Sequence, residues 1–355
     1  MRVLRSVSLL VCACLLAGAL LSCSSPSGNG AQEPKTQAKS YYEYFDTVST
    51  VLSYAGDSAD TFHANCDAVS EILQEYHRLL DIYYEYTGIN NLKTVNRNAG
   101  VAPVKVDRKL IDFLLYAKEI YALTNGATNI AMGSVLKLWH DAREKGIDDP
   151  EHAYLPSDSE LAAAAEHTDI NSLVIDEAAG TVFLTDPLMR LDVGAIGKGY
   201  ATERAAELLI ARGVSAYVLN IGGNIRAIGT KTSGRGWSTG ITNPDKNAEN
   251  EFVCTVEIKD TSLVTSGDYE RYFVVGGVRY HHIIDPKTNQ PAAYFSSVSV
   301  QTKDGGLADA LSTALFCMSY EEGLALINGI GDVEVVWVGK DGTVKLTNGI
   351  TRPEG

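Results

Sequence analysis

Apolar residues recur at helical spacing in four segments of the chain. Over residues 67–86 an apolar side chain falls at nearly every third or fourth position, which is the stripe expected of an amphipathic helix. The members of this stripe are Val69, Ile72, Leu73, Tyr76, Leu80 and Tyr83. Further helices are predicted over residues 108–123, 200–212 and 307–318, and Gly213 is a typical stop signal for the second of these.

Short β-rich segments and glycine turns lie between these helices. Strands are predicted over residues 48–54, 216–221, 252–258 and 333–338. Gly276-Gly277 favours a tight hairpin over residues 272–284, and Gly180 turns a second hairpin over residues 172–185. Because hairpins and helices are mixed along the chain, the predicted fold class is α+β, with mixed β-sheets and flanking helices, rather than a doubly wound parallel sheet.

Residues 1–22 have the layout of a secretory signal peptide. Arg2 and Arg5 precede an apolar run over residues 7–21, which is shorter than the ~20 apolar residues of a membrane span. The sequence "LLSC" that ends at Cys23 resembles a bacterial lipobox, in which the cysteine is diacylated and becomes the mature N-terminus. The alternative is a plain signal peptide with a chance cysteine.

Residues 23–40 are predicted to form a disordered tether from Cys23, because residues 24–40 have almost nothing apolar to bury. The remaining residues 41–355 are expected to form the catalytic body. The protein is therefore expected to be lipid-anchored at the extracytoplasmic face of a bacterial membrane, either the inner membrane or the cell surface.

Charge and cysteine content exclude several function classes. The 355 residues carry 30 Lys and Arg against 44 Asp and Glu, a formal charge of −14, which argues against binding to nucleic acid or to anionic lipid. An anionic substrate would need a local cation. Beyond the signal and lipobox, only Cys66, Cys254 and Cys317 remain, and their odd number and wide spacing fit neither a disulfide framework nor a zinc site.

Two adjacent histidines stand in "VRYHHIIDPKT", residues 278–288. Side chains alternate along a strand, so His281 and His282 are expected to face opposite ways and cannot share one metal ion. At most one of them serves any given cleft.

The glycine-rich stretch "LDVGAIGKGYA", residues 191–201, is a turn between a predicted strand and a helix. Such a turn exposes backbone N–H groups to an anion, but it serves equally as a packing turn. It matches neither the Walker A loop nor the dinucleotide-binding order of glycines. Another glycine pair, in "NIGGNI", is typical of a bulge or hairpin turn.

Asp309 and Thr313 are four residues apart on the helix predicted over residues 307–318, so they share a face. A carboxylate and a hydroxyl are oxygen ligands that suit Mg²⁺. The alternative is structural, because an Asp in a first turn stabilises the helix dipole and a Thr within a helix often bonds a backbone carbonyl.

Five motifs, in this order, resemble the ApbE family of FAD:protein FMN transferases. They are "TNGATNIAMGSVLKLW", "LDVGAIGKGYA", "NIGGNI", "TSGDYERYF...RYHHIIDPKTNQP" and "ADALSTALF", and the resemblance spans residues 42–338. It implies a single ApbE-like domain that, with Mg²⁺, cleaves FAD at its diphosphate. The FMN half is joined through its phosphate to a threonine of a partner protein, and AMP is released.

The resemblance also implies roles for the metal-binding and reacting groups. Asp309 and Thr313 match the family's magnesium ligands, and the backbone carbonyl of Ala195 matches a third. Ser312 stands where some members have an additional Asp. His282, directly before Ile-Ile-Asp-Pro, matches the catalytic histidine, and His281 is expected to be a bystander.

Flavin-nucleotide contacts are implied along most of the chain. Asp192 and Lys198 match contacts in the glycine turn, and Tyr86 matches an aromatic residue that stacks on the flavin. The remaining positions are Phe45, Ala127, Thr128, Asn129 and Ile284, with Ile283 nearly as good a match as Ile284. Thr128 and Asn129 replace the Phe and Asp that are common in the family, so that contact is expected to be changed.

The implied partners are FAD, the membrane through the lipid anchor, and an acceptor protein of the Nqr, Rnf or FMN-binding-domain kind. Two other functions share most of these residues. One is hydrolysis of FAD to FMN and AMP, with water in place of threonine. The other is a non-catalytic flavin-binding lipoprotein, which would be expected to lack the metal ligands or the histidine.

Overall fold

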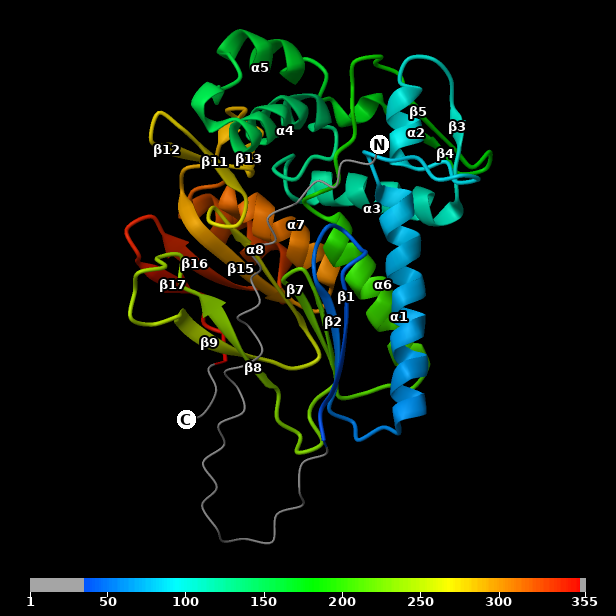
Figure 1. Cartoon of the computed structure of the whole chain (residues 1–355), viewed down its shortest axis with the longest axis vertical. Coiled ribbons are helices and arrows are strands. Elements are labelled where there is room, and N and C mark those ends of the chain that lie inside the picture. The colour runs from blue at the N-terminus through cyan, green and yellow to red at the C-terminus, as the bar shows by residue number, and fades with distance from the viewer. Residues whose placement is uncertain (1–34, 352–355) are drawn as a thin grey trace, which may run out of the picture. The chain divides into compact units, whose positions relative to one another are not determined.

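Eight antiparallel strands form the central sheet of the computed structural model, which describes residues 35–351 (Figure 1). Their order is β1-β2-β6-β7-β10-β15-β16-β17. The bounds are β1 Gln37–Tyr41, β2 Ser49–Ser53, β6 Tyr217–Ile221, β7 Asn224–Ile228, β10 Ser262–Gly267, β15 Phe295–Thr302, β16 Glu334–Gly339 and β17 Val344–Leu346. Because every pairing in this sheet is antiparallel, the α+β prediction is confirmed.

Smaller sheets surround the central one. They consist of β3 Val104–Lys105, β4 Leu173–Asp176 and β5 Thr181–Leu184, and of the pairs β8 Trp237–Thr242 with β9 Phe252–Ile258, β11 Tyr272–Val275 with β12 Val278–His281, and β13 Ile284–Asp285 with β14 Gln290–Pro291. Gly276 and Gly277 join β11 to β12 with φ of 57° and 81°, the left-handed conformation that a two-residue hairpin loop requires.

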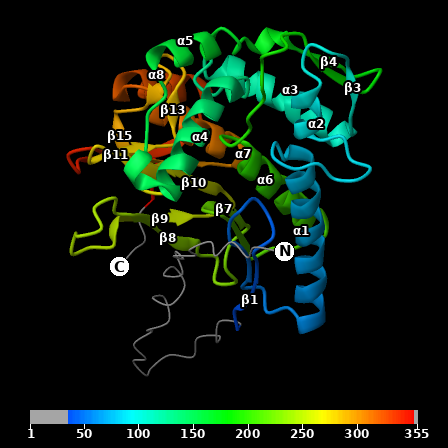
Figure 2. The ribbon, with the colours of Figure 1, turned by 45° about the horizontal axis from the view of Figure 1, so that its top comes forward.

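Eight α-helices and two short 3₁₀ helices lie among residues 35–351. They are α1 Ala59–Leu80, α2 Leu92–Arg97, α3 Arg108–Leu123, α4 Gly133–Asp148, α5 Asp158–Ala165, α6 Gly197–Ala211, α7 Gly305–Phe316 and α8 Tyr320–Ile330, with 3₁₀ turns at Pro150–His152 and Ile170–Ser172. Figures 1 and 2 show α1 beside α6 on one side of the central sheet, whereas the β8–β9 hairpin lies on the other side.

The alternation of side chains along the strands produces these layers. In β6, Tyr217 and Leu219 pack into the cluster that contains α1 and α6, while Val218 packs into the cluster that contains β8 and β9. In β16, Trp337 packs with α7 and α8, and Val336 packs with the hairpin. The sheet is therefore covered on both faces.

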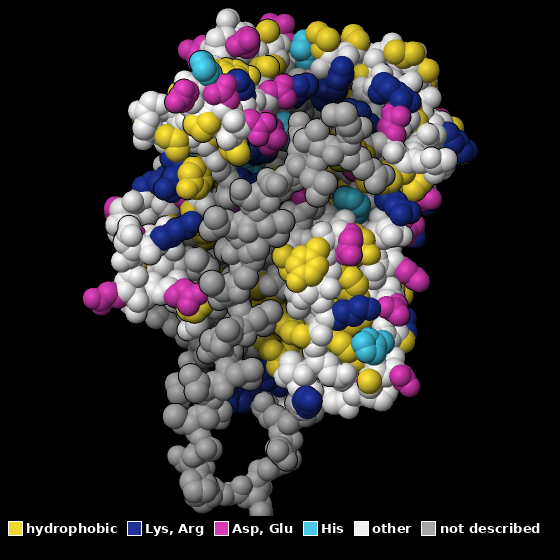
Figure 3. All heavy atoms as spheres, viewed as in Figure 1, with side chains coloured by type: hydrophobic (Ala, Val, Ile, Leu, Met, Phe, Trp, Pro, Cys, Tyr) yellow, Lys and Arg dark blue, Asp and Glu magenta, His cyan; other side chains and the backbone are white. Residues whose placement is uncertain are grey.

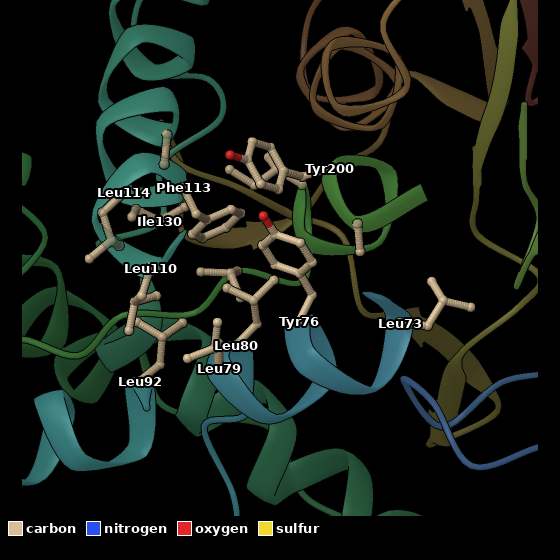
Figure 4. Packing of buried hydrophobic residues seen from close by; sticks show 14 of the residues in the cluster. Leu73, Tyr76, Leu79, Leu80, Leu92, Leu110, Phe113, Leu114, Ile130 and Tyr200 are labelled. Atoms are coloured by element: carbon tan, nitrogen blue, oxygen red, sulfur yellow. The ribbon is translucent and has the colours of Figure 1, made fainter. Parts of the chain in front are cut away.

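Aromatic rings join the helices that support the glycine turn. Tyr76 of α1 lies 5.5 Å from Tyr200 of α6, with the rings nearly perpendicular, and Phe113 of α3 lies 5.1 Å from the same ring (Figure 4). Edge-to-face contacts of this kind are favourable beyond the apolar area that they bury. They fix the start of α6, where the glycine turn ends.

Helices α6 and α7 approach each other closely. A Cβ on Gly199 would lie 2.2 Å from the carbonyl oxygen of Gly305, so only glycine fits there. The buried carboxylate of Glu203 on α6 accepts the Gly305 N–H at 2.8 Å and pairs with Arg226 of β7 at 3.1 Å. Loss of one partner of such a buried pair leaves an uncompensated charge, so the pair holds the start of α7 in place.

Several predicted elements are confirmed and others had wrong bounds. The helix predicted over residues 108–123 is α3, and the strand over residues 252–258 is β9. The helix predicted over residues 67–86 is instead α1, Ala59–Leu80, because Ser58 caps its first turn and the chain turns at Asp81. Helices α6 and α7 begin three and two residues earlier than predicted, at Gly197 and Gly305.

The N-terminal predictions lie mostly outside the described residues. The signal peptide, Cys23 and most of the tether belong to residues 1–34 and stay predictions. The predicted end of the tether at residue 40 is wrong, because residues Gln37–Tyr41 pair with β2 as strand β1. In the described part of the chain, residues 35–351, no helix combines the length and the apolar character of a membrane span.

Acidic and basic side chains are interspersed over the face shown in Figure 3, and neither sign of charge dominates its visible part. The net charge of −14 is thus not concentrated in one patch on this face. Binding of an anion on this face would therefore depend on individual side chains rather than on a charged patch.

Candidate functional site

Asp309 is a buried carboxylate at the contact between α6 and α7, with 5% of the residue exposed. Its Oδ2 accepts the backbone N–H of Gly199 at 2.8 Å, and its Oδ1 lies 4.0 Å from the ammonium of Lys198. Burial raises the pKa of Asp309, while Lys198 and the Gly199 N–H oppose that shift. The negative charge of the Asp309 carboxylate is therefore only partly compensated by Lys198.

Thr313 lies one turn after Asp309 and belongs to a group of hydroxyls. Ser266 of β10 has its Oγ 2.8 Å from Ser312 Oγ and 3.4 Å from Thr313 Oγ1. Ser312 also donates to the backbone oxygen of Asp309 at 2.9 Å. Ser312 is thus engaged within the protein.

These groups fit Mg²⁺ better than a softer metal. Among residues 35–351 no three His, Cys, Asp or Glu side chains cluster as a metal site. Asp309, the hydroxyl of Thr313 and the carbonyl of Ala195 are oxygen donors, and Mg²⁺ typically takes few protein ligands and keeps water and phosphate oxygens. A single buried carboxylate matches that behaviour.

Asp192 precedes the glycine turn, and its Oδ1 accepts the N–H of Gly194 at 2.9 Å. Burial raises the pKa of Asp192, and the Gly194 N–H and the charge of Arg143 oppose that shift. Asp192 and Lys198 flank the turn with Ala195 between them, and their contacts with a nucleotide stay a prediction.

Phe45 and Tyr86 meet around His77 of α1. The backbone N–H of Phe45 donates to His77 Nδ1 at 3.2 Å, so the other ring nitrogen carries the proton and faces the Tyr86 hydroxyl at 3.3 Å. That hydroxyl donates to Asp81 at 2.7 Å. Phe45 and its neighbour Asp46 both have left-handed backbones, with φ of 55° and 50°. This conformation is uncommon for a bulky residue such as Phe45, and such residues often occur at functional sites.

The two adjacent histidines differ in environment, as the alternation predicts. His281 is 7% exposed; its Nε2 donates to the carbonyl of Ala292 at 2.9 Å, and its ring packs edge-on against Phe316. It is therefore a structural residue rather than a bystander. His282 lies just beyond the end of β12, and its Nδ1 faces the carbonyl of Arg271 at 3.2 Å.

A carbonyl oxygen only accepts hydrogen bonds, so Nδ1 of His282 carries the proton and Nε2 keeps its lone pair. Burial and, to a smaller extent, the positive charges of Arg271 and Arg143 together lower the pKa of His282 to about 3. The ring is thus neutral near pH 7 and able to accept a proton at Nε2.

Helix α4 contributes side chains that the sequence analysis missed. Arg143 donates to His140 Nδ1 at 2.9 Å, and the His140 ring lies 5.4 Å from that of Tyr83. The charges of Asp192, Arg143 and Arg271 all act on the Tyr83 hydroxyl, whose pKa burial raises to about 12. A signal was present, because Val135, Trp139, Ala142 and Gly146 form a buried stripe at helical spacing.

The segment 127–129 is only loosely part of this site. Thr128 is buried and donates to the carbonyl of Ala310 at 2.8 Å, and Asn129 donates to the carbonyl of Thr168 at 2.9 Å. Of the predicted site residues, only Ala127 and Asn129 line a neighbouring cavity of about 1070 Å³. The side chains of Thr128 and Asn129 are therefore both used in hydrogen bonds within the protein.

Ile283 and Ile284 are both buried. Ile284 packs with Met132 and Trp139, and Ile283 packs with α7 in a different cluster. A nucleotide contact at either position would therefore have to use the backbone.

The family model described as the ApbE family matches residues 45–337 of the chain. A protein named FAD:protein FMN transferase from Treponema pallidum is 34% identical over 318 residues, which cover 86% of this chain and 85% of the relative. A protein of the same name from Klebsiella pneumoniae is 31% identical over 280 residues, which cover 79% of this chain and 84% of that one.

Solved structures of similar proteins have the same fold. The ApbE protein of Thermotoga maritima superposes with a TM-score of 0.76 at 26% identity, covering 88% of this chain and 97% of that one. The flavin transferase ApbE of Vibrio cholerae superposes with a TM-score of 0.71 at 27% identity, covering 88% of this chain and 96% of that one.

Proposed function

Because the chain belongs to the ApbE family and is an FAD:protein FMN transferase, we propose that it joins FMN from FAD to a threonine hydroxyl of a partner protein and releases AMP. We propose further that the reaction depends on Mg²⁺ held by Asp309, Thr313 and the carbonyl of Ala195. The transferase activity follows from the relatives, whereas the metal, the threonine and the leaving group are the proposed details.

The position of Asp309 is the observation that best supports the proposed metal site. Its carboxylate is buried against the first turn of α6, between the Gly199 N–H and the Lys198 ammonium. A buried carboxylate with so little compensation favours a bound cation. When Mg²⁺ is bound, it neutralises charge on the diphosphate oxygens of FAD.

His282 is proposed to act as the general base. Its Nε2 accepts the proton of the threonine hydroxyl while the hydroxyl oxygen bonds to the FMN-side phosphorus. The bond from that phosphorus to the bridging oxygen breaks, and AMP leaves with the bridging oxygen and its electron pair. Because Nδ1 is held by the carbonyl of Arg271, the ring keeps the tautomer that this step needs.

The aromatic group around His77 is proposed to hold the flavin. The Tyr86 ring is held by the hydrogen bond of its hydroxyl to Asp81, and the Phe45 ring packs edge-on against His77 at 5.6 Å. A ring that is held in place loses little freedom when another aromatic ring stacks on it. Tyr86 is therefore a suitable surface for the flavin ring system.

The proposed acceptors are FMN-carrying subunits of membrane redox complexes of the Nqr and Rnf kind, or related FMN-binding domains. Lipid attachment at Cys23 would keep the enzyme close to such complexes, at the extracytoplasmic face of the membrane.

One assay tests this proposal. The protein without its signal peptide is incubated with FAD, Mg²⁺ and an FMN-binding acceptor domain, and flavin fluorescence is sought on the denatured acceptor. A fluorescent band and acceptor-dependent AMP release are expected. AMP release at equal rates with and without the acceptor, and no band, would mean that the protein hydrolyses FAD instead.

The metal assignment is tested with Asp309→Asn. Mg²⁺ binding measured by calorimetry and acceptor labelling should both be lost. Asp332→Asn makes the same change of charge at an exposed position and should retain both. Full metal binding by Asp309→Asn would refute the assignment.

A further inference from the structure

Two arginine side chains near His282 have little negative charge to balance them. Arg143 has 18% of its side chain exposed, and the carboxylate paired with it is that of its exposed neighbour Glu144, at 3.8 Å. Its hydrogen bond goes to His140 Nδ1, a neutral acceptor. Among residues 35–351, no ion pair involves Arg271.

The fold brings the two guanidinium groups to the same end of the β11–β12 hairpin. Tyr272 pairs with His281 in the hairpin register, so Arg271 lies opposite His282, whose backbone N–H donates to the Arg271 carbonyl at 3.1 Å. Both residues therefore stand at the open end of the hairpin.

Helix α4 packs across this hairpin on one face. Trp139 stacks on Tyr280 at 6.3 Å, and Gly146 lies against Phe273. Arg143 is four residues after Trp139 and three before Gly146, so it belongs to the same face of the helix. The packing of α4 thus directs Arg143 toward the hairpin.

The electrostatics agree with this packing. Burial and then the charge of Arg271 lower the pKa of Arg143, and burial followed by the charges of both arginines lowers the pKa of His282. The carboxylates of Glu144 and Asp192 oppose this shift in the pKa of Arg143. Two like charges that act on each other are unfavourable, more so because Arg143 is largely buried, and a bound anion relieves that cost.

We propose that Arg143 and Arg271 bind the FMN-side phosphate of FAD, the group to which the acceptor threonine is joined. This inference rests on the proposed function. His282 has to reach the hydroxyl that attacks this phosphorus, so this phosphate is the anion that must lie beside it. The planar guanidinium group donates two parallel hydrogen bonds to phosphate oxygens, on which charge is spread during transfer.

His140 is a positioning residue in this arrangement. Because its Nδ1 accepts from Arg143, its tautomer is fixed, and its contact with Tyr83 limits its rotation. It thereby holds the Arg143 guanidinium in one orientation.

Ligand pairs that differ by one phosphate test the proposal. Binding of FMN, riboflavin, AMP and adenosine is measured by fluorescence or calorimetry in EDTA, without acceptor. For Arg143→Gln we expect FMN affinity to fall about tenfold or more while riboflavin affinity is unchanged, because a charge-assisted hydrogen bond is lost. The preference for AMP over adenosine should not change.

Lys145→Gln is the matched control, because it removes a positive charge from an exposed position on the same helix. If Arg143→Gln does not fold, Arg271→Gln serves instead, with Arg279→Gln on β12 as its control; Arg271 is exposed, so its loss should not affect folding. An unchanged ratio of FMN to riboflavin affinity in a folded variant would overturn the proposal.

A second outcome would also overturn the proposal that the two arginines bind the phosphate. If Arg143→Gln raised KM for the acceptor and left the FMN preference intact, the arginine would bind the acceptor polypeptide instead. The proposed function fails separately, when the unmodified enzyme labels no acceptor at all.

Discussion

His281 and His282 have opposite environments although they are adjacent in the chain. The imidazole of His281 is buried, with both ring nitrogens hydrogen-bonded within the protein, whereas His282 has its Nδ1 held and its Nε2 available. The first arrangement stabilises the fold and the second suits proton transfer.

Separate alanine substitutions should therefore have different effects. His282→Ala should bind FAD normally and lose about 10²–10⁴-fold in kcat, the usual contribution of a general base. His281→Ala should retain kcat per folded molecule but lose about 2–4 kcal/mol of unfolding free energy, from a cavity and a lost hydrogen bond. Urea denaturation and steady-state kinetics measure the two quantities, and equal loss of kcat in both variants would contradict these roles.

The protonation state of His282 gives a second prediction at this scale. Burial and the two arginines lower its pKa to about 3, so the ring should remain neutral from pH 8 down to about pH 5, whereas an ordinary imidazole becomes charged near pH 6.5. The test is NMR of histidine ring signals in the ligand-free protein, with the His282 signal assigned by its absence from His282→Ala. A His282 signal that titrates near pH 6.5 would disprove the shift.

At this scale the contacts of the candidate residues were harder to predict than the residues themselves. Asp309 and Lys198 lie 4.0 Å apart at the contact between α6 and α7, and the roles proposed for them and for His282 stay predictions. The partners of Thr128 and Asn129 were not predictable, because the Thr128 hydroxyl bonds a carbonyl 182 residues away in the chain. Hydrogen bonds between residues so far apart in the sequence depend on how whole helices and strands pack.

Among the elements, the contact between α6 and α7 determines the geometry of the site. A side chain on Gly199 would meet Gly305 and the Cβ of Asp309, the latter at 2.4 Å. The glycine turn is therefore a packing turn, which is one of the two interpretations of its sequence, and its contact with an anion stays a prediction.

Gly199→Ala should push the two helices apart. We expect a loss of about 1–3 kcal/mol in unfolding free energy, the usual cost of overpacking, and weaker Mg²⁺ binding because Asp309 moves. Gly329→Ala is the matched control in α8, where an added Cβ meets nothing within 4 Å and the better helix propensity should leave stability equal or slightly higher. Calorimetric Mg²⁺ binding that is equal in both variants would refute a role for this contact.

Helices and strands were predicted correctly where the local sequence signals were complete. The hairpin at Gly276-Gly277 was predictable because two residues with left-handed backbone fix the turn and the register of its strands. Helix α1 was displaced because the apolar stripe continues into Tyr83, beyond the point at which Asp81 accepts the backbone N–H groups of Tyr83 and Tyr84 and stabilises a turn. Helix α4, and with it Arg143, was missed although its stripe was readable.

For the whole molecule, the proposed lipid anchor at Cys23 would determine where the reaction takes place. Cys23→Ser should move the protein from the membrane fraction to the soluble extracytoplasmic fraction, because one thioether-linked diacyl anchor would be lost. Its activity on a soluble acceptor domain should be unchanged, because the catalytic domain itself is not altered. Membrane fractionation followed by immunoblotting measures this, and an unaltered membrane share would show that Cys23 is not the anchor.

The central claim is that FMN passes intact from FAD to a protein hydroxyl. The measurement that tests it most directly is the intact mass of an acceptor domain after incubation with the enzyme, FAD and Mg²⁺. The account predicts an acceptor heavier by one FMN less one water, with the modification on a threonine, and no such species with His282→Ala. An acceptor of unchanged mass while FAD is consumed to FMN and AMP would contradict it.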